Sequence, residues 1–194
     1  MSDEERPEQP SGERPYERDE LRRASSLVLV NTGDGKGKST AAFGTILRAV
    51  ALEWPVAVVQ FLKSGTWNTG EEKVCRSIGV EWYAAGDGFT WESDDLDETE
   101  AKAVAAWRFA EQLVAAGNHR LIVLDEISYA MTWGWIDADA VVTSLRTRPA
   151  DVNVILTGRD MAQPVIDVAD TVTEMTKVKH AFDQRIRAKR GIDF

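Results

Sequence analysis

The chain has 194 residues, of which 43% are hydrophobic and 28% charged, a size and composition typical of one ordinary globular α/β domain. The net charge of −9 argues against nonspecific nucleic-acid binding, which needs a basic surface, and no apolar run reaches the ~18 residues of a membrane span. The single cysteine, Cys75, excludes an internal disulfide and a cysteine metal cage, and its expected role is packing.

The first 24 residues differ in composition from the rest of the chain. They contain three of the six prolines, eight acidic residues and five arginines. Such a stretch buries too little apolar surface to fold alone. We therefore expect residues 1–24 to be a disordered or flexible arm and residues 25–194 to form one domain. No basic-then-apolar signal pattern is present at the N-terminus, so we expect a cytoplasmic protein.

From residue 25 onward, short apolar strands alternate with helices. The expected strands are 27–31, 56–61, 80–84, 121–124, 152–156 and 171–175. The expected helices are 38–53, a short one that ends near Gly79, 95–116, 137–146 and 162–168. Continuous apolar strands separated by helices are typical of a parallel sheet covered on both faces. The sequence thus predicts an α/β fold. His119 follows the helix-ending pair Gly117-Asn118 and is expected at the surface.

The first expected strand runs directly into a glycine-rich loop, and a helix follows. The loop reads Gly33-Asp34-Gly35-Lys36-Gly37-Lys38-Ser39-Thr40. Glycines let a backbone surround a phosphate, and the helix N-terminus adds the positive end of its dipole. Lys38 would reach the phosphate oxygens, and the Ser39 hydroxyl is the expected Mg²⁺ ligand. A purely structural glycine turn does not explain a Lys-Ser pair at the start of a helix, so phosphate binding and a P-loop NTPase-like fold are favoured.

The spacing of this loop departs from the standard one, because the first glycine comes one residue late. Counting back from Gly37, the standard position holds Thr32, and the glycine is Gly33. A generic ATPase is therefore a weaker interpretation than the lysine and serine alone would suggest.

Two carboxylates, Asp125 and Glu126, end the apolar run at 121–124. Ligands of open α/β sheets sit beyond the carboxyl ends of the strands, and carboxylates there suit Mg²⁺ and its water shell. The alternative is a cap for the following segment. We expect Glu126 to bind the metal directly, and Asp125 to contact the ligands of the metal and not the metal itself.

Together with three further motifs, these features resemble the ATP:cob(I)alamin adenosyltransferases of the P-loop type. The matching segments lie at 33–44, 59–63, 88–92, 123–126, 155–159, 178–183 and 191–194. The late glycine is that family's own pattern. This chain departs from it in having Asp34 where the family usually has Asn, and Ser39 where it usually has Thr. A carboxylate near phosphates is unfavourable unless it points away or meets a cation.

The resemblance implies that Co(I) of a corrinoid attacks C5′ of ATP and that triphosphate leaves. It implies ATP as co-substrate, Mg²⁺, a homodimer, and a reductase or flavoprotein that supplies electrons. The net charge and the lack of a long apolar run lead us to expect no nucleic-acid or membrane partner. ATP contacts are then expected at the loop residues from Gly33 to Thr40 and at Arg48, Arg159, Lys179 and His180. The corrinoid would meet Gly88, Phe89, Thr90 and Trp91, where Phe89 and Trp91 would exclude the lower ligand of cobalt and so act in catalysis beside Lys38. Without the resemblance, these two aromatics would be read as core packing.

Other interpretations use the same loop differently. A phosphotransferase or simple ATPase would cleave the terminal phosphate and release ADP. A nucleotide-switched partitioning protein would need a second lysine five residues before Lys38, where Gly33 stands. A corrinoid carrier would bind cobalamin without turning over ATP.

Overall fold

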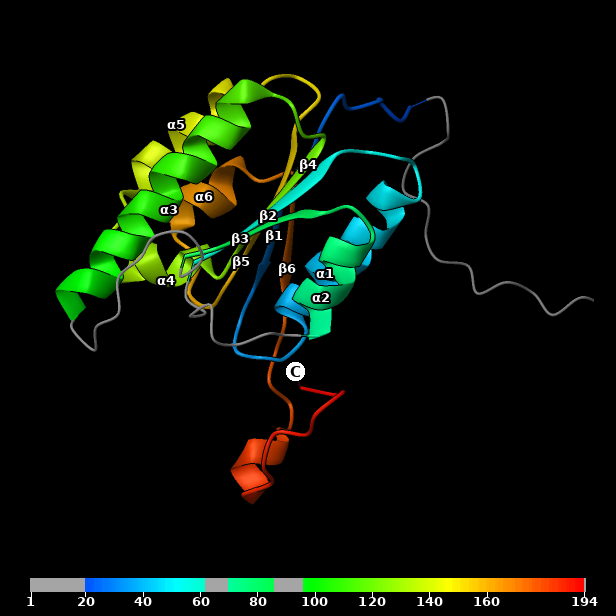
Figure 1. The fold of residues 1–194 in the computed structure, drawn as a ribbon. Helices are drawn as coiled ribbons and strands as arrows, with labels where there is room; N and C mark the ends of the chain where they lie inside the picture. Colours follow the sequence, from blue (N-terminus) through cyan, green and yellow to red (C-terminus); the bar gives the residue numbers. More distant parts are fainter. Residues whose placement is uncertain (1–19, 62–69, 86–95, 194) are drawn as a thin grey trace, which may run out of the picture.

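The computed structural model describes residues 20–61, 70–85 and 96–193, and its centre is a six-stranded sheet in which every paired strand is parallel (Figure 1). The strand order is β3-β2-β4-β5-β1-β6. The strands are β1 (Val28–Thr32), β2 (Val56–Gln60), β3 (Glu81–Ala84), β4 (Leu121–Asp125), β5 (Asn153–Thr157) and β6 (Thr171–Glu174). The predicted α/β class and parallel sheet are confirmed.

Helices cover both faces of this sheet. They are α1 (Lys38–Val50), α2 (Gly70–Ser77), α3 (Leu96–Ala116), α4 (Ile127–Thr132), α5 (Ala138–Thr147) and α6 (Gln163–Val168), with a 3₁₀ helix, η1 (Ala181–Gln184). Figure 1 shows α1 and α2 on one face and the other α-helices on the opposite face. Neither α4 nor η1 was expected from the sequence, because their N-cap residues, Glu126 and His180, are not residues that usually mark a helix start.

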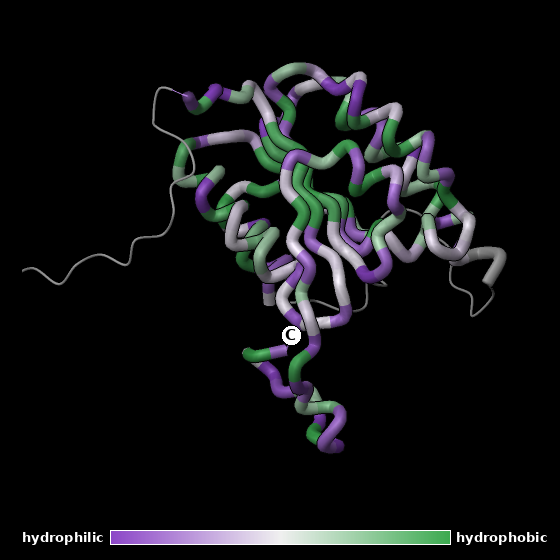
Figure 2. Tube along the Cα trace, turned by 180° about the vertical axis from the view of Figure 1, so that it is seen from behind, coloured by the Kyte–Doolittle hydropathy of each residue, from purple (hydrophilic) through white to green (hydrophobic). Residues whose placement is uncertain are grey.

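The strands are apolar because most of the sheet is buried on both sides. Every residue of β2 and of β4 is buried, and the apolar centre is visible in the hydropathy trace (Figure 2). One core cluster lies under α1 and contains Ile46 and the expected packing residue Cys75. The second, under α3 and α5, contains Trp107 and Leu145. Among the described residues, no helix has the length and apolar character needed to cross a bilayer.

The expectation for His119 is wrong. Its side chain is buried, at 6% exposure, and its Nε2 lies 3.2 Å from Oε2 of Glu81. The pair Gly117-Asn118 does follow the end of α3 at Ala116, but the imidazole is buried beside Glu81, the first residue of the edge strand β3.

The chain beyond β6 projects past the carboxyl ends of the strands (Figure 1). Large apolar side chains are exposed there, including Val178 at 93% and Phe182 at 77%. Of the expected N-terminal arm, residues 20–24 are described, and all of them are exposed.

Candidate functional site

The glycine-rich loop connects β1 to α1 at the carboxyl edge of the sheet. Two of its glycines need the left-handed region, since Gly33 has φ 91° and Gly37, at the helix N-cap, has φ 115°. The Asn31 side-chain amide donates to the Lys38 carbonyl at 3.1 Å, which ties the end of β1 to the first turn of α1. The loop is therefore anchored at both ends.

Lys38 folds back over the loop. Its Nζ donates to the carbonyl oxygens of Gly33 and Gly35 at 2.6 and 2.7 Å. Burial lowers the pKa of Lys38 and the nearby Arg159 lowers it further, whereas the carboxylates of Asp34 and Glu126 act in the opposite direction. The fold thus brings three predicted site residues, Asp34 of the same loop, Glu126 after β4 and Arg159 after β5, within electrostatic reach of the Lys38 ammonium group.

The loop also packs against the chain that leaves β6. The N–H of Gly35 donates to the Met175 carbonyl oxygen at 2.6 Å. A Cβ on Gly35 would lie 2.7 Å from that oxygen, and one on Gly33 would lie 2.6 Å from it. The glycines are therefore needed for this close approach as well as for the turn itself. Sequence reasoning missed Met175, which lies more than a hundred residues away in the chain.

Asp34, which stands where the family usually has Asn, lies beside a cation. Its Oδ1 lies 3.8 Å from Nε of Arg159, and both side chains are more than half exposed. Such a pair contributes little to stability in water. The pair acts on the charge of the loop, because the Arg159 guanidinium offsets the negative charge of Asp34 there.

Arg159 follows Gly158, which packs closely against Ser128 of α4 at the end of β5. Gly158 has φ 141°, and a Cβ there would lie 1.9 Å from Oγ of Ser128 on α4. The Gly-Arg pair therefore sits where the turn after β5 presses against α4, and the arginine next to it reaches toward the loop.

The carboxyl end of β4 is held by its two neighbouring strands. Asp125 is fully buried, and its two carboxylate oxygens accept from Gln60 Nε2 at 3.0 Å and from Thr157 Oγ1 at 2.7 Å. The next residue, Glu126, has the strained φ of 63°, and its N–H donates to Thr157 Oγ1 at 2.9 Å. A non-glycine residue held in this region is a frequent mark of a functional site. Gln60 and Thr157 both lie in the segments matched to the family, but no role was predicted for either.

The donors available for a metal are few. Within the described ranges, no group of three or more His, Cys, Asp or Glu residues could hold an ion. Mg²⁺ does not need one, because it keeps several waters and binds through one or two protein ligands and phosphate oxygens. The hydroxyl of Ser39 and the carboxylate of Glu126 fit that pattern, whereas the Asp125 carboxylate is already occupied by hydrogen bonds.

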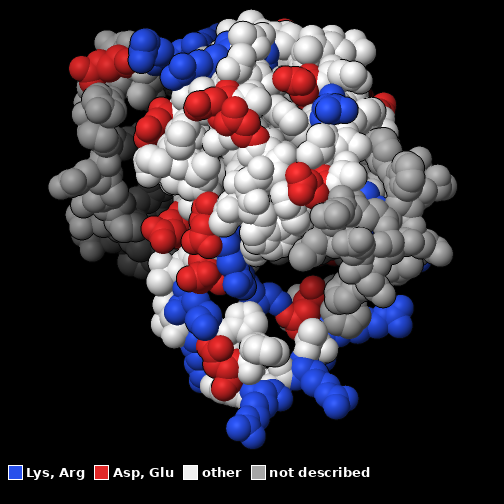
Figure 3. Space-filling view, turned by 90° about the vertical axis from the view of Figure 1, so that its left-hand side faces the viewer, with Lys and Arg blue, Asp and Glu red and all other residues white. Residues whose placement is uncertain are grey.

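The C-terminal segment adds positive charge beside the loop. A cavity of about 290 Å³ lies between them, lined by Lys36, Lys177, Lys179 and His180, among others. Nδ1 of His180 accepts from the N–H of Phe182 at 3.1 Å, which fixes the imidazole at the start of η1. Lys and Arg side chains gather on this projecting part of the molecule (Figure 3).

Some predicted residues are not brought to the loop. Arg48 lies in the last turn of α1, roughly 15 Å along the helix axis from Lys38 at 1.5 Å per residue. Thr40 is exposed on the first turn and lines a cavity between α1 and α2. Gly88, Phe89, Thr90 and Trp91 lie outside the described residues.

Comparison with known proteins gives a consistent result. The sequence profile of the family described as ATP:corrinoid adenosyltransferase BtuR/CobO/CobP matches residues 24–194. A corrinoid adenosyltransferase of Pseudomonas aeruginosa is 45% identical over 170 residues, covering 87% of this chain and 83% of that protein. The corrinoid adenosyltransferase CobA of Salmonella typhimurium is 41% identical over 168 residues, covering 87% and 85%.

Similarity among solved structures is at the level of the fold. The flagellar accessory protein FlaH of Methanocaldococcus jannaschii aligns with a TM-score of 0.51 at 12% identity, covering 78% of this chain and 71% of that one. That likeness supports a P-loop NTPase-like architecture.

Proposed function

Because the chain belongs to the ATP:corrinoid adenosyltransferase family BtuR/CobO/CobP, which adenosylates corrinoids at the expense of ATP, we propose that its glycine-rich loop and the ends of β4 and β5 form the ATP site of that reaction. The observation that carries the proposal is the convergence of Arg159, Asp34 and Glu126 on Lys38, whose ammonium lies between two loop carbonyls. The two cations, Lys38 of the loop and Arg159 after β5, suit a polyanion such as triphosphate, and the Glu126 carboxylate suits a metal ion bound to it.

In the proposed reaction, Co(I) of the corrinoid substrate attacks C5′ of ATP, the C5′–O bond breaks, and triphosphate leaves with the bonding electrons. No general base is required, because the cobalt nucleophile has no proton to lose. The protein's task is to neutralise the negative charge that grows on the leaving oxygen. Lys38 and Arg159, which lie near one another at the loop, would do this, and Lys36, Lys179 and His180, which line the adjacent cavity, would assist them.

Bound Mg²⁺ would supply further charge neutralisation on the triphosphate. Ser39 and Glu126 would hold it. Asp125 supports Glu126 indirectly, because Thr157 links the Asp125 carboxylate to the Glu126 backbone. This arrangement supports a role for Asp125 in positioning and for Glu126 in contact with the ion.

The rest of the proposal comes from the family resemblance. Phe89 and Trp91, with Gly88 and Thr90, would contact the corrinoid and remove the lower ligand of cobalt. The enzyme would act as a homodimer and receive electrons from a reductase or flavoprotein. Arg48, distant from Lys38 within one chain, is included among the ATP contacts on the resemblance alone.

The decisive experiment follows the fate of ATP. Incubation with chemically reduced cobalamin and ATP should release triphosphate and form light-sensitive adenosylcobalamin, whereas a phosphotransferase would release ADP. Lys38→Ala should reduce the rate at least a hundredfold, because the phosphates lose their central cation. Lys73→Ala, at an exposed position of α2, is the matched control. Near-normal turnover in Lys38→Ala, or ADP as product, would refute the assignment.

A further inference from the structure

The last described residues of the chain form a small turn with a fixed shape. Gly191 has φ 82°, and the N–H groups of Ile192 and Asp193 donate to the Lys189 carbonyl at 3.0 and 2.9 Å. Oδ2 of Asp193 accepts from the Lys189 N–H at 2.7 Å. The turn therefore presets the direction of the Asp193 carboxylate. This Gly-Ile-Asp sequence belongs to the matched motifs, yet nothing proposed so far gives it a task.

The second oxygen of Asp193 pairs with the phosphate loop. Nζ of Lys36 donates to Asp193 Oδ1, across a sequence separation of 157 residues. The exposed fraction is 53% for the Lys36 side chain and 25% for that of Asp193. The pair is accessible, and a charged solute can compete for it.

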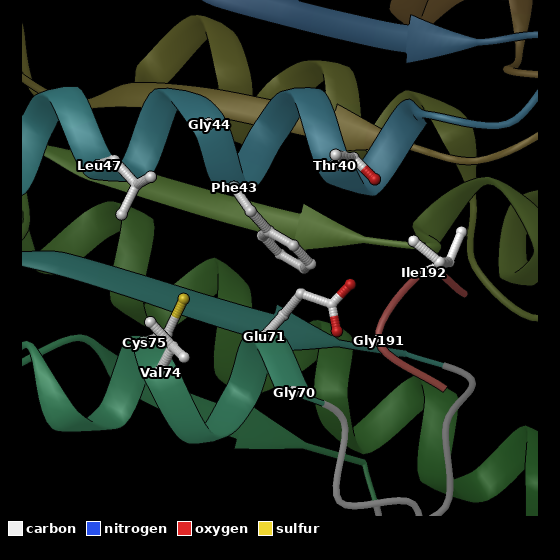
Figure 4. A pocket seen from close by; sticks show the side chains of 10 residues that line it. All are labelled: Thr40, Phe43, Gly44, Leu47, Gly70, Glu71, Val74, Cys75, Gly191 and Ile192. Carbon is white, nitrogen blue, oxygen red and sulfur yellow. The ribbon is translucent and has the colours of Figure 1, made fainter. Parts of the chain in front are cut away.

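The same turn also lies over the space between α1 and α2. A cavity of about 490 Å³ there is lined by Phe43 and Leu47 of α1, Val74 and Cys75 of α2, and Gly191 and Ile192 (Figure 4). The Ile192 side chain is still 76% exposed, so it covers the cavity mouth without filling it. Among the described residues, the ion pair of Lys36 and Asp193 ties this turn to the loop, so loss of the pair would remove one of its attachments.

The positive charges around Lys36 favour replacement of its partner, Asp193, by a phosphate group. The cavity of about 290 Å³ beside the loop is lined by Lys36, Lys177, Lys179 and His180, and Asp193 supplies a carboxylate in the same lining. A triphosphate has several negative charges to offer these cations, whereas Asp193 has one. Phosphate and Asp193 would meet the same ammonium, so they compete for it.

We propose that Asp193 is a positioning residue that holds Lys36 in the nucleotide-free enzyme and is displaced from it by a phosphate of ATP. The inference rests on the proposed function, because it requires phosphate at Lys36. Displacement frees the Gly191–Asp193 turn from the loop when nucleotide binds. Return of Asp193 to Lys36 after the reaction weakens the hold on triphosphate and assists its release.

The test measures binding of inorganic triphosphate to the full chain by calorimetry, without corrinoid. Asp193→Asn should lower the Kd about two- to fivefold, the range expected for removing one half-exposed competing ion pair. Asp193→Glu keeps the charge and should bind as the wild type does. Asp167→Asn, on α6, changes the net charge equally and should have no effect. In turnover, Asp193→Asn should be more strongly inhibited by added triphosphate, with kcat lowered by slower product release and KM for ATP unchanged or lowered.

The Lys36→Met background separates this inference from the proposed site. Lys36→Met should weaken triphosphate binding, and adding Asp193→Asn to it should change nothing further. If Lys36→Met binds triphosphate normally, the phosphate role of Lys36 is refuted together with the inference. If Lys36→Met weakens binding while Asp193→Asn leaves the Kd unchanged or raises it, the inference alone is overturned. An unfolding midpoint near that of the wild type shows that Asp193→Asn is folded.

Discussion

The Thr157 hydroxyl donates to the buried carboxylate of Asp125 at 2.7 Å, across the parallel pair β4 and β5. The same oxygen accepts the Glu126 N–H at 2.9 Å, and Gln60 binds the other carboxylate oxygen from β2 at 3.0 Å. Three neighbouring strands thereby hold the backbone at Glu126. Because this network is buried, any of its polar groups that lost its partner would have no water to replace the hydrogen bond.

Thr157→Val should therefore destabilise the fold, although valine has nearly the same shape as threonine. It removes a donor to Asp125 and an acceptor for Glu126, which leaves buried polar groups unpaired, so we expect a loss of about 1–3 kcal/mol in the free energy of unfolding. Turnover should also fall, because Glu126 loses a support. Thr157→Ser keeps the hydroxyl and should lie close to the wild type in denaturant titrations. Equal stabilities for the valine and serine variants would show that the hydroxyl has no such role.

Glu126→Gln tests the proposed Mg²⁺ contact. A neutral amide is a poorer ligand for a hard cation, so the Mg²⁺ concentration needed for half-maximal activity should rise about tenfold or more, while the unfolding midpoint changes little. The matched control is Glu111→Gln, on α3, where an exposed carboxylate is removed. An unchanged Mg²⁺ titration in Glu126→Gln would argue that another group holds the ion.

Gly158→Ala should be severely destabilising. The added Cβ would meet Ser128 Oγ at 1.9 Å and Ser128 Cβ at 2.7 Å, and φ 141° is unfavourable for alanine. Overpacking and backbone strain together predict a loss of about 3 kcal/mol or more, measured by thermal unfolding. Adding Ser128→Gly removes the two clashing atoms and should recover part of the loss. No recovery in the double variant would mean that strain alone explains the effect.

Glu81 should give the protein a pH-dependent contribution to stability. The Tyr83 hydroxyl donates to its carboxylate at 2.5 Å, and this bond, more than the nearby His119, lowers the pKa of Glu81 against the opposing effect of burial. A carboxyl whose pKa is lower in the folded state stabilises the fold above its unfolded pKa of about 4.3, and this contribution disappears as the pH falls through the folded value.

Glu81→Gln should accordingly lower the free energy of unfolding at pH 7 by about 1 kcal/mol or less, since the side chain is half exposed. The difference from the wild type should shrink toward zero below about pH 4. Tyr83→Phe keeps the edge-on ring contact with Phe109, at 4.6 Å between centroids, but removes the hydrogen bond to Glu81. Its loss of unfolding free energy relative to the wild type should therefore vary with pH as that of Glu81→Gln does. A difference that does not vary with pH would contradict the carboxylate's role.

Phe89 and Trp91 are predicted to lower the coordination of bound Co(II) corrinoid. Without either ring, water or the base would return beneath cobalt, donate electron density and make reduction of Co(II) harder. Phe89→Ala and Trp91→Ala should therefore lose at least tenfold in assays that start from Co(II), and much less when Co(I) is supplied chemically. Paramagnetic resonance of Co(II)cobalamin with ATP reads the ligand state. Identical five-coordinate signals from the wild type and both variants would contradict the mechanism.

The sequence by itself determined the features that depend on neighbouring residues. Apolar runs predicted the parallel strands because both faces of most of those strands are buried, and the Lys38-Ser39 pair after Gly37 marked the start of the helix that follows the glycine-rich loop. Glu126 was placed at the ligand edge because it follows an apolar strand in an open α/β sheet. The short helix α4 was not predicted, because its N-cap residue, Glu126, is not a residue that usually marks a helix start.

Tertiary structure decided which groups meet across long stretches of chain. Asp125 meets Thr157 over 32 residues and Gln60 over 65, and Lys36 meets Asp193 over 157. It placed Met175 against the loop glycines and put His119 below the surface. Local periodicity has no information on these contacts, because they arise only when parallel strands bring distant segments to one edge of the sheet.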